Sequence, residues 1–256
     1  MSPALPRTPS FRLDGRRALV TGGGRGLGVA IAAALAQAGA EVVVAARSGD
    51  EVEAVAAAIR AEGGRASALA FDVTDIAAAA HAVDSQPRFD ILVNNAGGNR
   101  PGPFLQATPQ DYDWLMSLNV KASFFLSQAV AQRLVAEESP GSIIMISSQM
   151  GHVGAANRAM YCASKHAIEG LVKAMAVELG PRGIRVNAIA PTFIETPMTK
   201  PYFENPDFRA ETLGKIKLGR LGIAQDLMGA VVYLASDASA LVTGASLRID
   251  GGWTAE

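Results

Sequence analysis

The sequence has 256 residues, of which 49% are hydrophobic and 18% charged, with a formal net charge of −1. A chain of this length and composition can bury one sizeable core, and its near-neutral charge provides no basic surface for nucleic acid. The single cysteine, Cys162, excludes an internal disulfide and favours a reducing compartment, so we expect a cytoplasmic protein. No apolar run is long enough to span a membrane, and residues 1–11 predict a flexible tail rather than a secretory signal.

From residue 12 to the end, short apolar runs alternate with longer alanine-rich runs. Strands are predicted at 16–21, 41–46, 66–73, 90–97, 142–148, 184–191 and 246–251, and helices at 26–39, 49–64, 108–119, 119–137, 159–179 and 224–235. The strand runs are almost wholly apolar, as expected where helices cover both faces of a sheet. This alternation predicts a single α/β domain of Rossmann type, with a doubly wound parallel sheet in a three-layer α/β/α arrangement. The least regular stretch, 192–223, is a candidate substrate lid.

A glycine-rich stretch, TGGGRGLG (21–28), separates the first predicted strand from the first helix. Glycine lets the backbone turn tightly and approach a ligand closely. The free N–H groups at the start of the helix attract anions such as a pyrophosphate. At the first strand-to-helix crossover of an α/β fold, this pattern predicts dinucleotide binding.

Tyr161 and Lys165 lie four residues apart in the predicted helix 159–179, so both project from one face. Packing alone could explain the pair, but a proton-transfer site explains it as well. A tyrosine base at neutral pH needs its pKa lowered by about 3 units, or about 4 kcal/mol. An ammonium at about 5 Å supplies roughly 3 kcal/mol of this, so we expect Lys165 to lower the pKa of Tyr161.

These motifs together resemble the short-chain dehydrogenase/reductase family over residues 12–253. Besides TGGGRGLG and YCASK (161–165), the resemblance rests on six further motifs: DVT (72–74), NNAG (94–97), LNV (118–120), SS (147–148), RVNAIAP (185–191) and the closing DGG (250–252). The pattern is similar to that of gluconate and sugar-alcohol dehydrogenases and of 3-oxoacyl-acyl-carrier-protein reductases. It implies an NAD(P)-dependent oxidoreductase that interconverts a secondary alcohol and a ketone.

The resemblance also implies roles for individual residues and no metal. Tyr161 would be the general acid/base, Lys165 would also hold the nicotinamide ribose, Ser148 would bind the substrate oxygen, and Asn119 would hold a water. Apart from Tyr161 and Lys165, the implied cofactor contacts are Gly22, Arg25, Gly26, Leu27, Gly28, Arg47, Asp72, Val73, Asn94, Ala96, Gly97, Pro191, Ile194 and Thr196. Ser148 follows an apolar strand, which agrees with a site at the carboxyl edge of the sheet.

Cofactor choice depends on the end of the second strand. An acidic residue there would bind the ribose hydroxyls of NAD, but this chain has Ala46 followed by Arg47, with Arg25 in the glycine loop. Two guanidinium groups favour a 2′-phosphate, so we expect NADP to be preferred, with NAD possible. The family usually has Pro-Gly after the sixth strand. Here Thr192 follows Pro191, so we expect the turn that contacts nicotinamide to differ.

The substrate is less well defined by sequence. The positions expected to face it, besides Ser148 and Tyr161, are Gln149, Met150, His152, Asn157 and Arg158, with Asn99 and Arg100 on the loop after NNAG. This polar set favours a small polyol, sugar or sugar acid, unless several of these side chains simply face water. A 3-oxoacyl thioester on an acidic carrier protein is the alternative, which Glu137 and Glu138 disfavour and Arg182 favours. A dinucleotide-binding regulator without catalysis is a third.

The helices expected at 119–137 and 159–179 carry wide apolar faces, and a monomer would leave part of them exposed. Relatives pair these helices across a two-fold axis, so we expect a homotetramer.

Overall fold

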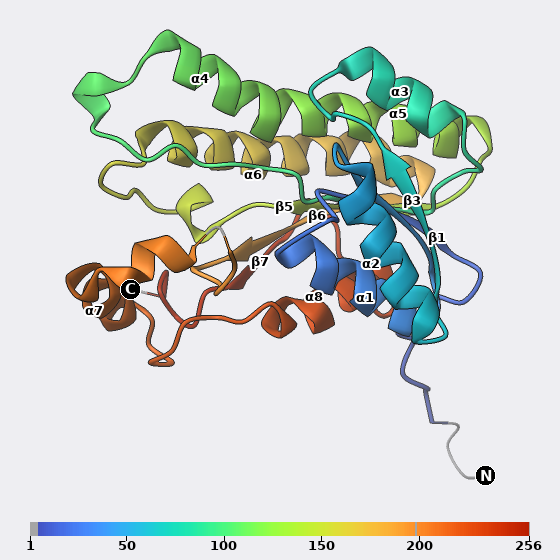
Figure 1. The fold of residues 1–256 in the computed structure, drawn as a ribbon. Helices are drawn as coiled ribbons and strands as arrows, with labels where there is room; N and C mark the ends of the chain where they lie inside the picture. Colours follow the sequence, from blue (N-terminus) through green and yellow to red (C-terminus); the bar gives the residue numbers. More distant parts are fainter. Residues whose placement is uncertain (1–4, 198, 256) are drawn as a thin grey trace.

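The computed structural model describes residues 5–197 and 199–255. Its centre is a seven-stranded sheet in the order β3-β2-β1-β4-β5-β6-β7, and every neighbouring pair is parallel (Figure 1). The strands are β1 (Arg17–Thr21), β2 (Glu41–Ala46), β3 (Arg65–Ala70), β4 (Ile91–Asn94), β5 (Gly141–Ile146), β6 (Ile184–Pro191) and β7 (Ser246–Ile249).

Helices cover both faces of this sheet, which confirms the expected three-layer α/β/α fold. One face carries α1 (Leu27–Gln37), α2 (Gly49–Ala61) and α8 (Gln225–Ala235). The other carries α3 (Ile76–Asp84), α5 (Ala122–Ala136) and α6 (Ala159–Leu179), and α4 (Pro109–Met116) lies next to α6. Each face has its own buried apolar cluster.

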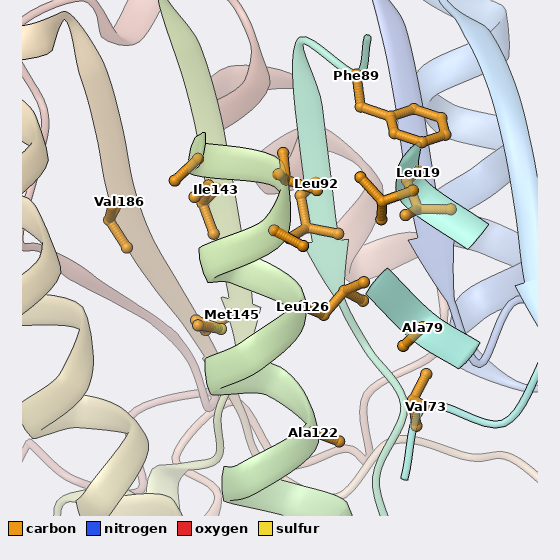
Figure 2. Packing of buried hydrophobic residues seen from close by; sticks show 14 of the residues in the cluster. Leu19, Val73, Ala79, Phe89, Leu92, Ala122, Leu126, Ile143, Met145 and Val186 are labelled. Carbon is orange, nitrogen blue, oxygen red and sulfur yellow. The ribbon is translucent and has the colours of Figure 1, made fainter. Parts of the chain in front are cut away.

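The two clusters follow from the alternation of side chains along each strand. In β1, Leu19 packs on the α5 side of the sheet, near Leu126 (Figure 2). Its neighbours Ala18 and Val20 pack on the α1 side, in the same cluster as Ile31. All three strand residues are fully buried, so substitution of any of them by a polar residue would disrupt one layer.

The chain crosses over the sheet between β3 and β4, so that β1 lies between β2 and β4. Connections leave β1 and β4 toward opposite faces, which opens a crevice at their carboxyl ends. The glycine-rich stretch and the NNAG motif meet at this crevice.

Several element boundaries differ from the sequence expectation. Strands β3 and β4 end earlier than predicted, at Ala70 and Asn94, so DVT and most of NNAG lie in loops. Helix α3 was not predicted, although Asp75 caps it by accepting a hydrogen bond from the N–H of Ala78 at 3.0 Å.

The candidate lid 192–223 is more regular than expected. It contains a 3₁₀ helix, η5 (Lys200–Glu204), and α7 (Pro206–Lys215), which Asn205 caps. Aromatic rings hold the segment together, with Phe193 centred 5.6 Å from Phe208 and 5.8 Å from Trp253 near the C-terminus. The short-range capping and the ring contacts explain why a sequence without clear periodicity still forms a helix here. Residue 198 lies outside the described residues.

Residues 5–10 of the expected tail are exposed and form neither helix nor strand, and residues 1–4 lie outside the described residues. Across the described ranges, every helix is too short or too polar to span a membrane.

Candidate active site

The glycine-rich stretch wraps around the start of α1 at the sheet crevice. Gly22 and Gly26 have left-handed φ angles of 61° and 58°. A Cβ on Gly28 would collide with the carbonyl oxygen of Gly22, so only glycine fits there. Gly26 caps α1 without a side-chain hydrogen bond, and no acidic residue lies in the first turn. The N–H groups at the start of α1 are therefore left for an anion, such as a phosphate.

The end of β2 provides charge on the same side of the crevice. Arg47 follows β2 directly, and its side chain is 77% exposed with one guanidinium nitrogen 3.9 Å from the Asp72 carboxylate. Burial opposes ionisation of Asp72, but hydrogen bonds from Thr74 and the charge of Arg47 lower its pKa overall. Thr74 donates both its N–H, at 2.9 Å, and its hydroxyl, at 2.7 Å. Asp72 is thus held in its own turn, while Arg47 remains accessible.

Tyr161, Lys165 and Ser148 come together beyond the end of β5. Lys165 is buried in α6, and its Nζ donates to the carbonyl of Ile146 at 2.8 Å and lies 5.6 Å from the centre of the Tyr161 ring. The Ser148 hydroxyl lies close enough to the Tyr161 phenol to lower its pKa. An amine, a phenol and a hydroxyl therefore share one location at the carboxyl edge of the sheet.

Asn119 joins this group from the other side of the crevice. It lies in a single π-helical turn, Ser117–Lys121, between α4 and α5. Its amide accepts from the N–H of Gly98 at 2.9 Å and donates to the carbonyl of Gly98 at 3.0 Å and to Ser164 Oγ at 3.1 Å. A Cβ on Gly97 would lie 3.3 Å from Asn119 Oδ1 and 3.9 Å from Lys165 Nζ. The π turn thus fixes the loop that borders the lysine.

The segment that follows β6 lies against the phosphate loop at the edge of the crevice. A Cβ on Gly26 would lie 3.9 Å from Cβ of Thr196, so this segment meets the phosphate loop. Thr192 stands where the family usually has glycine, and its backbone is not strained. Its φ angle is not left-handed, since the only left-handed non-glycine residues in the described ranges are Glu138 and Asn157. Ile194 is buried and pairs with Gly222.

The comparisons with known proteins agree with this geometry. A family model described as "Enoyl-(Acyl carrier protein) reductase" matches residues 22–254. L-xylulose reductase of Bos taurus is 39% identical over 245 residues, 96% of this chain and 99% of its own. D-threitol dehydrogenase of Mycolicibacterium smegmatis is 41% identical over 249 residues, 95% of both chains. A crystal structure of gluconate 5-dehydrogenase from Burkholderia cenocepacia, in complex with NADP and tartrate, is 38% identical, covers 96% of this chain and 98% of its own, and has a TM-score of 0.93.

The chain belongs to the short-chain dehydrogenase/reductase family. It is an NAD(P)-dependent enzyme of this family that acts on hydroxyl groups.

A dinucleotide fits the residues that this dehydrogenase presents. The glycine cradle has no room for side chains, and the start of α1 has no internal counter-charge. Two buried polar atoms at the same edge, Thr192 Oγ1 and Gln149 Nε2, have no hydrogen-bond partner in the described structure. Buried polar groups are nearly always paired, so these atoms point to a ligand that completes the site.

The protonation of the dehydrogenase's tyrosine differs from the sequence expectation. Burial raises the pKa of Tyr161, and the nearby Ser148 hydroxyl and the charge of Arg158 oppose that rise. Burial also lowers the pKa of Lys165 to about 8, against the effect of the Glu169 charge, which raises it. Without a bound ligand, burial therefore outweighs the lowering of the Tyr161 pKa that we expected from Lys165, whose ammonium is bonded to the carbonyl of Ile146. The lowering stays a prediction for the enzyme with its cofactor bound.

The residues expected to face the substrate divide into two groups. Gln149 and Met150 are buried beside Ser148, which donates to Gln149 Oε1 at 2.7 Å and accepts from the N–H of Met150 at 3.1 Å. His152 instead lies beside Glu169, one turn further along α6 than Lys165, where its Nε2 is 3.0 Å from Ser246 Oγ and 3.3 Å from Glu169 Oε1. Asn157 is exposed and in the left-handed region, with its carbonyl accepting from Gly102.

The expected contact of Asn94 with the cofactor stays a prediction, but its side chain does not face the crevice. The Asn94 amide points into the core, donating to Ser127 Oγ at 2.9 Å and to Met145 Sδ at 3.2 Å. The following residue, Asn95, bonds to the phosphate loop instead. Side chains alternate along a strand, so the burial of Asn94 at the end of β4 was the signal that could have distinguished them.

Proposed function

We propose that this chain is an NADP-linked dehydrogenase that interconverts a secondary alcohol and a ketone of a small polyhydroxylated compound. The observation that carries the proposal is the grouping of Ser148, Tyr161 and Lys165 within reach of the glycine cradle. Phenol, ammonium and hydroxyl together can move a proton to or from a carbonyl oxygen. NADP, when bound, supplies or accepts the hydride.

The residue roles follow from the groups each side chain offers. The Ser148 hydroxyl holds the substrate oxygen, and Tyr161 takes its proton in oxidation or returns it in reduction. Lys165 provides a positive charge beside the phenol, which favours the phenolate when a ligand excludes water. Asn119 keeps the loop around Gly98 in place and is the proposed holder of a relay water.

The cofactor contacts inferred from sequence remain part of the proposal. Arg47 is accessible at the end of β2, where Ala46 leaves space rather than a carboxylate, and Arg25 is exposed in the glycine loop. Both guanidiniums suit a 2′-phosphate. Structures of relatives hold NADP, including the gluconate 5-dehydrogenase of Burkholderia cenocepacia. We therefore expect a lower Kd for NADP than for NAD, and an equal or lower Kd for NAD would contradict this.

A 3-oxoacyl-acyl-carrier-protein reductase is the second candidate, because the description of the matching family model, an enoyl reductase, also names an acyl carrier protein. Arg182 is exposed, as a docking residue for an acidic partner would be. However, Glu137 lies near the same surface and already pairs with Arg88 at 3.0 Å and Arg133 at 3.1 Å. The relatives named above act on xylulose, threitol or gluconate, so small polar substrates are favoured.

Assembly and location are also proposals. Tyr112, Trp114, Phe124 and Phe125 expose between 36% and 47% of their surfaces on α4 and α5, which favours burial against a second copy. We propose a cytoplasmic homotetramer in which the described part of the segment 192–223 covers the ligand and residues 5–11 form a tail. A monomeric mass by light scattering at micromolar concentration would contradict the assembly.

The test is an oxidation screen with NADP and with NAD, read by nicotinamide absorbance, over polyols, sugar acids, aliphatic diols and a hydroxyacyl thioester. We expect turnover of polar alcohols with NADP, and loss of turnover with retained NADP binding in Tyr161→Phe. Activity on the thioester alone would favour the carrier-protein reductase. Absence of any turnover would leave the non-catalytic regulator, and undiminished turnover by Tyr161→Phe would remove the tyrosine from the mechanism.

A further inference from the structure

Arg158 is a buried cation beside the proposed active site. It precedes α6 immediately, one helical turn before Tyr161, and only 8% of its surface is exposed. The one hydrogen bond of its side chain within the described structure is a long one, from Nη1 to the carbonyl of Asn157 at 3.4 Å. In the described ranges no carboxylate forms an ion pair with it.

Burying a guanidinium without a counter-charge is costly, because the cation loses its hydration. Other arginines of the chain pair with a carboxylate: Arg100 pairs with Asp111 at 2.6 Å, and Arg220 pairs with Asp226 at 2.6 Å. Both of those side chains are also about half exposed. Arg158 is exposed over only 8% of its surface and, within residues 5–197 and 199–255, has no carboxylate paired with it.

The surroundings of Arg158 place it between the tyrosine and the lid. Tyr202 of η5 covers the guanidinium, with the Arg158 Cζ 5.4 Å from the ring centre. The carbonyl of Asn157 accepts a hydrogen bond from Gly102 at 3.0 Å, which brings in the loop after NNAG. Arg158 is also close enough for its charge to act on the Tyr161 hydroxyl. Three segments of the crevice thus meet at this cation.

We propose that Arg158 binds the carboxylate of the substrate, so that the enzyme acts on a hydroxylated carboxylic acid rather than a neutral polyol. The inference rests on the proposed function and specifies its substrate class. A planar carboxylate matches the two parallel N–H groups of a guanidinium. A single guanidinium carries one positive charge, which matches a monoanionic carboxylate better than a dianionic phosphate ester.

The experiment compares three substrates that differ only at one end: an aldonate, the alditol of the same carbon number, and its phosphate ester. The wild-type enzyme should have the highest kcat/KM for the aldonate. Arg158→Gln should lower kcat/KM for the aldonate about 100-fold, or about 2.7 kcal/mol, and change that for the alditol less than about threefold. Arg158→Lys should recover part of the aldonate activity, because the charge returns without the paired N–H groups.

Arg60→Gln is the matched control, since it removes the same charge from a partly exposed site on α2, which covers the opposite face of the sheet from α6. It should change kcat/KM for neither the aldonate nor the alditol. Equal losses for aldonate and alditol in Arg158→Gln, or a wild-type preference for the alditol or phosphate ester, would overturn the inference. If the wild type turns over none of the three, the proposed function fails first.

A binding measurement keeps the inference testable in that case. In Tyr161→Phe loaded with NADPH, the aldonate should quench or shift nicotinamide fluorescence, and the additional Arg158→Gln change should remove this response. The NADPH titration of each variant reports whether it is folded. Equal aldonate binding with and without Arg158 would overturn the inference independently of turnover.

Discussion

Asn95 donates two hydrogen bonds to Thr21, which ties the end of β4 to the end of β1. Its backbone N–H binds Thr21 Oγ1 at 3.1 Å, and its side-chain Nδ2 binds the Thr21 carbonyl at 2.9 Å. The same Nδ2 reaches the carbonyl of Gly22 at 3.0 Å. Because Gly22 begins the phosphate loop, this asparagine holds the loop against the neighbouring strand connection.

Asn95→Ala should therefore weaken cofactor binding as well as the fold. Loss of the side-chain bonds to Thr21 and Gly22 is expected to lower the free energy of unfolding by about 1–2 kcal/mol. A freer loop should raise the Kd for NADP about tenfold, measured by calorimetric titration. Asn187→Ala is the control, since that buried amide bridges Val242 and Ala245 away from the loop. Similar destabilisation with an unchanged Kd in both variants would make Asn95 purely structural.

Gly28 is the position where a single methyl group should do most harm to the phosphate loop. A Cβ there meets the Gly22 carbonyl and would lie 2.7 Å from Cα of Gly23, both of them backbone atoms that cannot move aside cheaply. Gly28→Ala should raise the Kd for NADP at least about tenfold, or about 1.4 kcal/mol. Gly229, exposed within α8 with nothing within 4 Å, is the opposite case. Gly229→Ala should raise the free energy of unfolding by about 0.5–1 kcal/mol and leave the Kd unchanged.

Glu169 supports the charge of Lys165 from one turn further along α6. Burial lowers the pKa of Lys165 to about 8, and the Glu169 charge raises it. Glu169→Gln should therefore lower that pKa further, so that the ammonium is lost at a lower pH and the alkaline limb of kcat/KM moves to lower pH. The amide oxygen of glutamine can still accept from Ser246, which preserves packing. A uniform loss of activity with no displacement of the limb would assign Glu169 to structure alone.

Asp226, which bonds to Arg220 and Ile223 at the end of the segment 192–223, should make the free energy of unfolding depend on pH. Hydrogen bonds from Arg220 lower its pKa to about 2, burial opposes this, and the N–H of Ile223 contributes a further bond. Since the folded pKa lies below the ordinary 3.8, the stabilisation is complete above about pH 4 and is lost as the pH falls toward 2. Arg220 is 56% exposed, so we expect Asp226→Asn to cost only about 1 kcal/mol at pH 7.

Urea unfolding of both proteins from pH 7 to pH 3 measures this effect. The difference between them should shrink below pH 4. A difference that stays constant across the range would mean that the hydrogen bonds, rather than the charge, provide the stabilisation.

Some features of this protein depend on short-range patterns, and the sequence alone determined them. The alternation of apolar strands with alanine-rich helices was enough to predict a parallel sheet covered on both faces. The spacing of Tyr161 and Lys165 defines one face of a helix wherever that helix lies, and α6 has the predicted bounds, Ala159–Leu179. The glycines of residues 21–28 likewise predicted a tight turn from the local sequence, because that turn requires left-handed φ angles.

Other features arise from contacts between distant segments, and only the tertiary structure decided them. Asn119 meets Gly98 and Ser164, which lie 21 and 45 residues away, and no local pattern encodes those contacts. Which of Asn94 and Asn95 turns its side chain toward the phosphate loop depended on where β4 ends. The pKa of Tyr161 depended on burial by several elements, which sequence spacing does not measure. In the sequence, Arg158 is similar to any arginine at the start of a helix. Folding buries it beside η5 and the loop near Gly102, where no carboxylate of the described residues pairs with its charge.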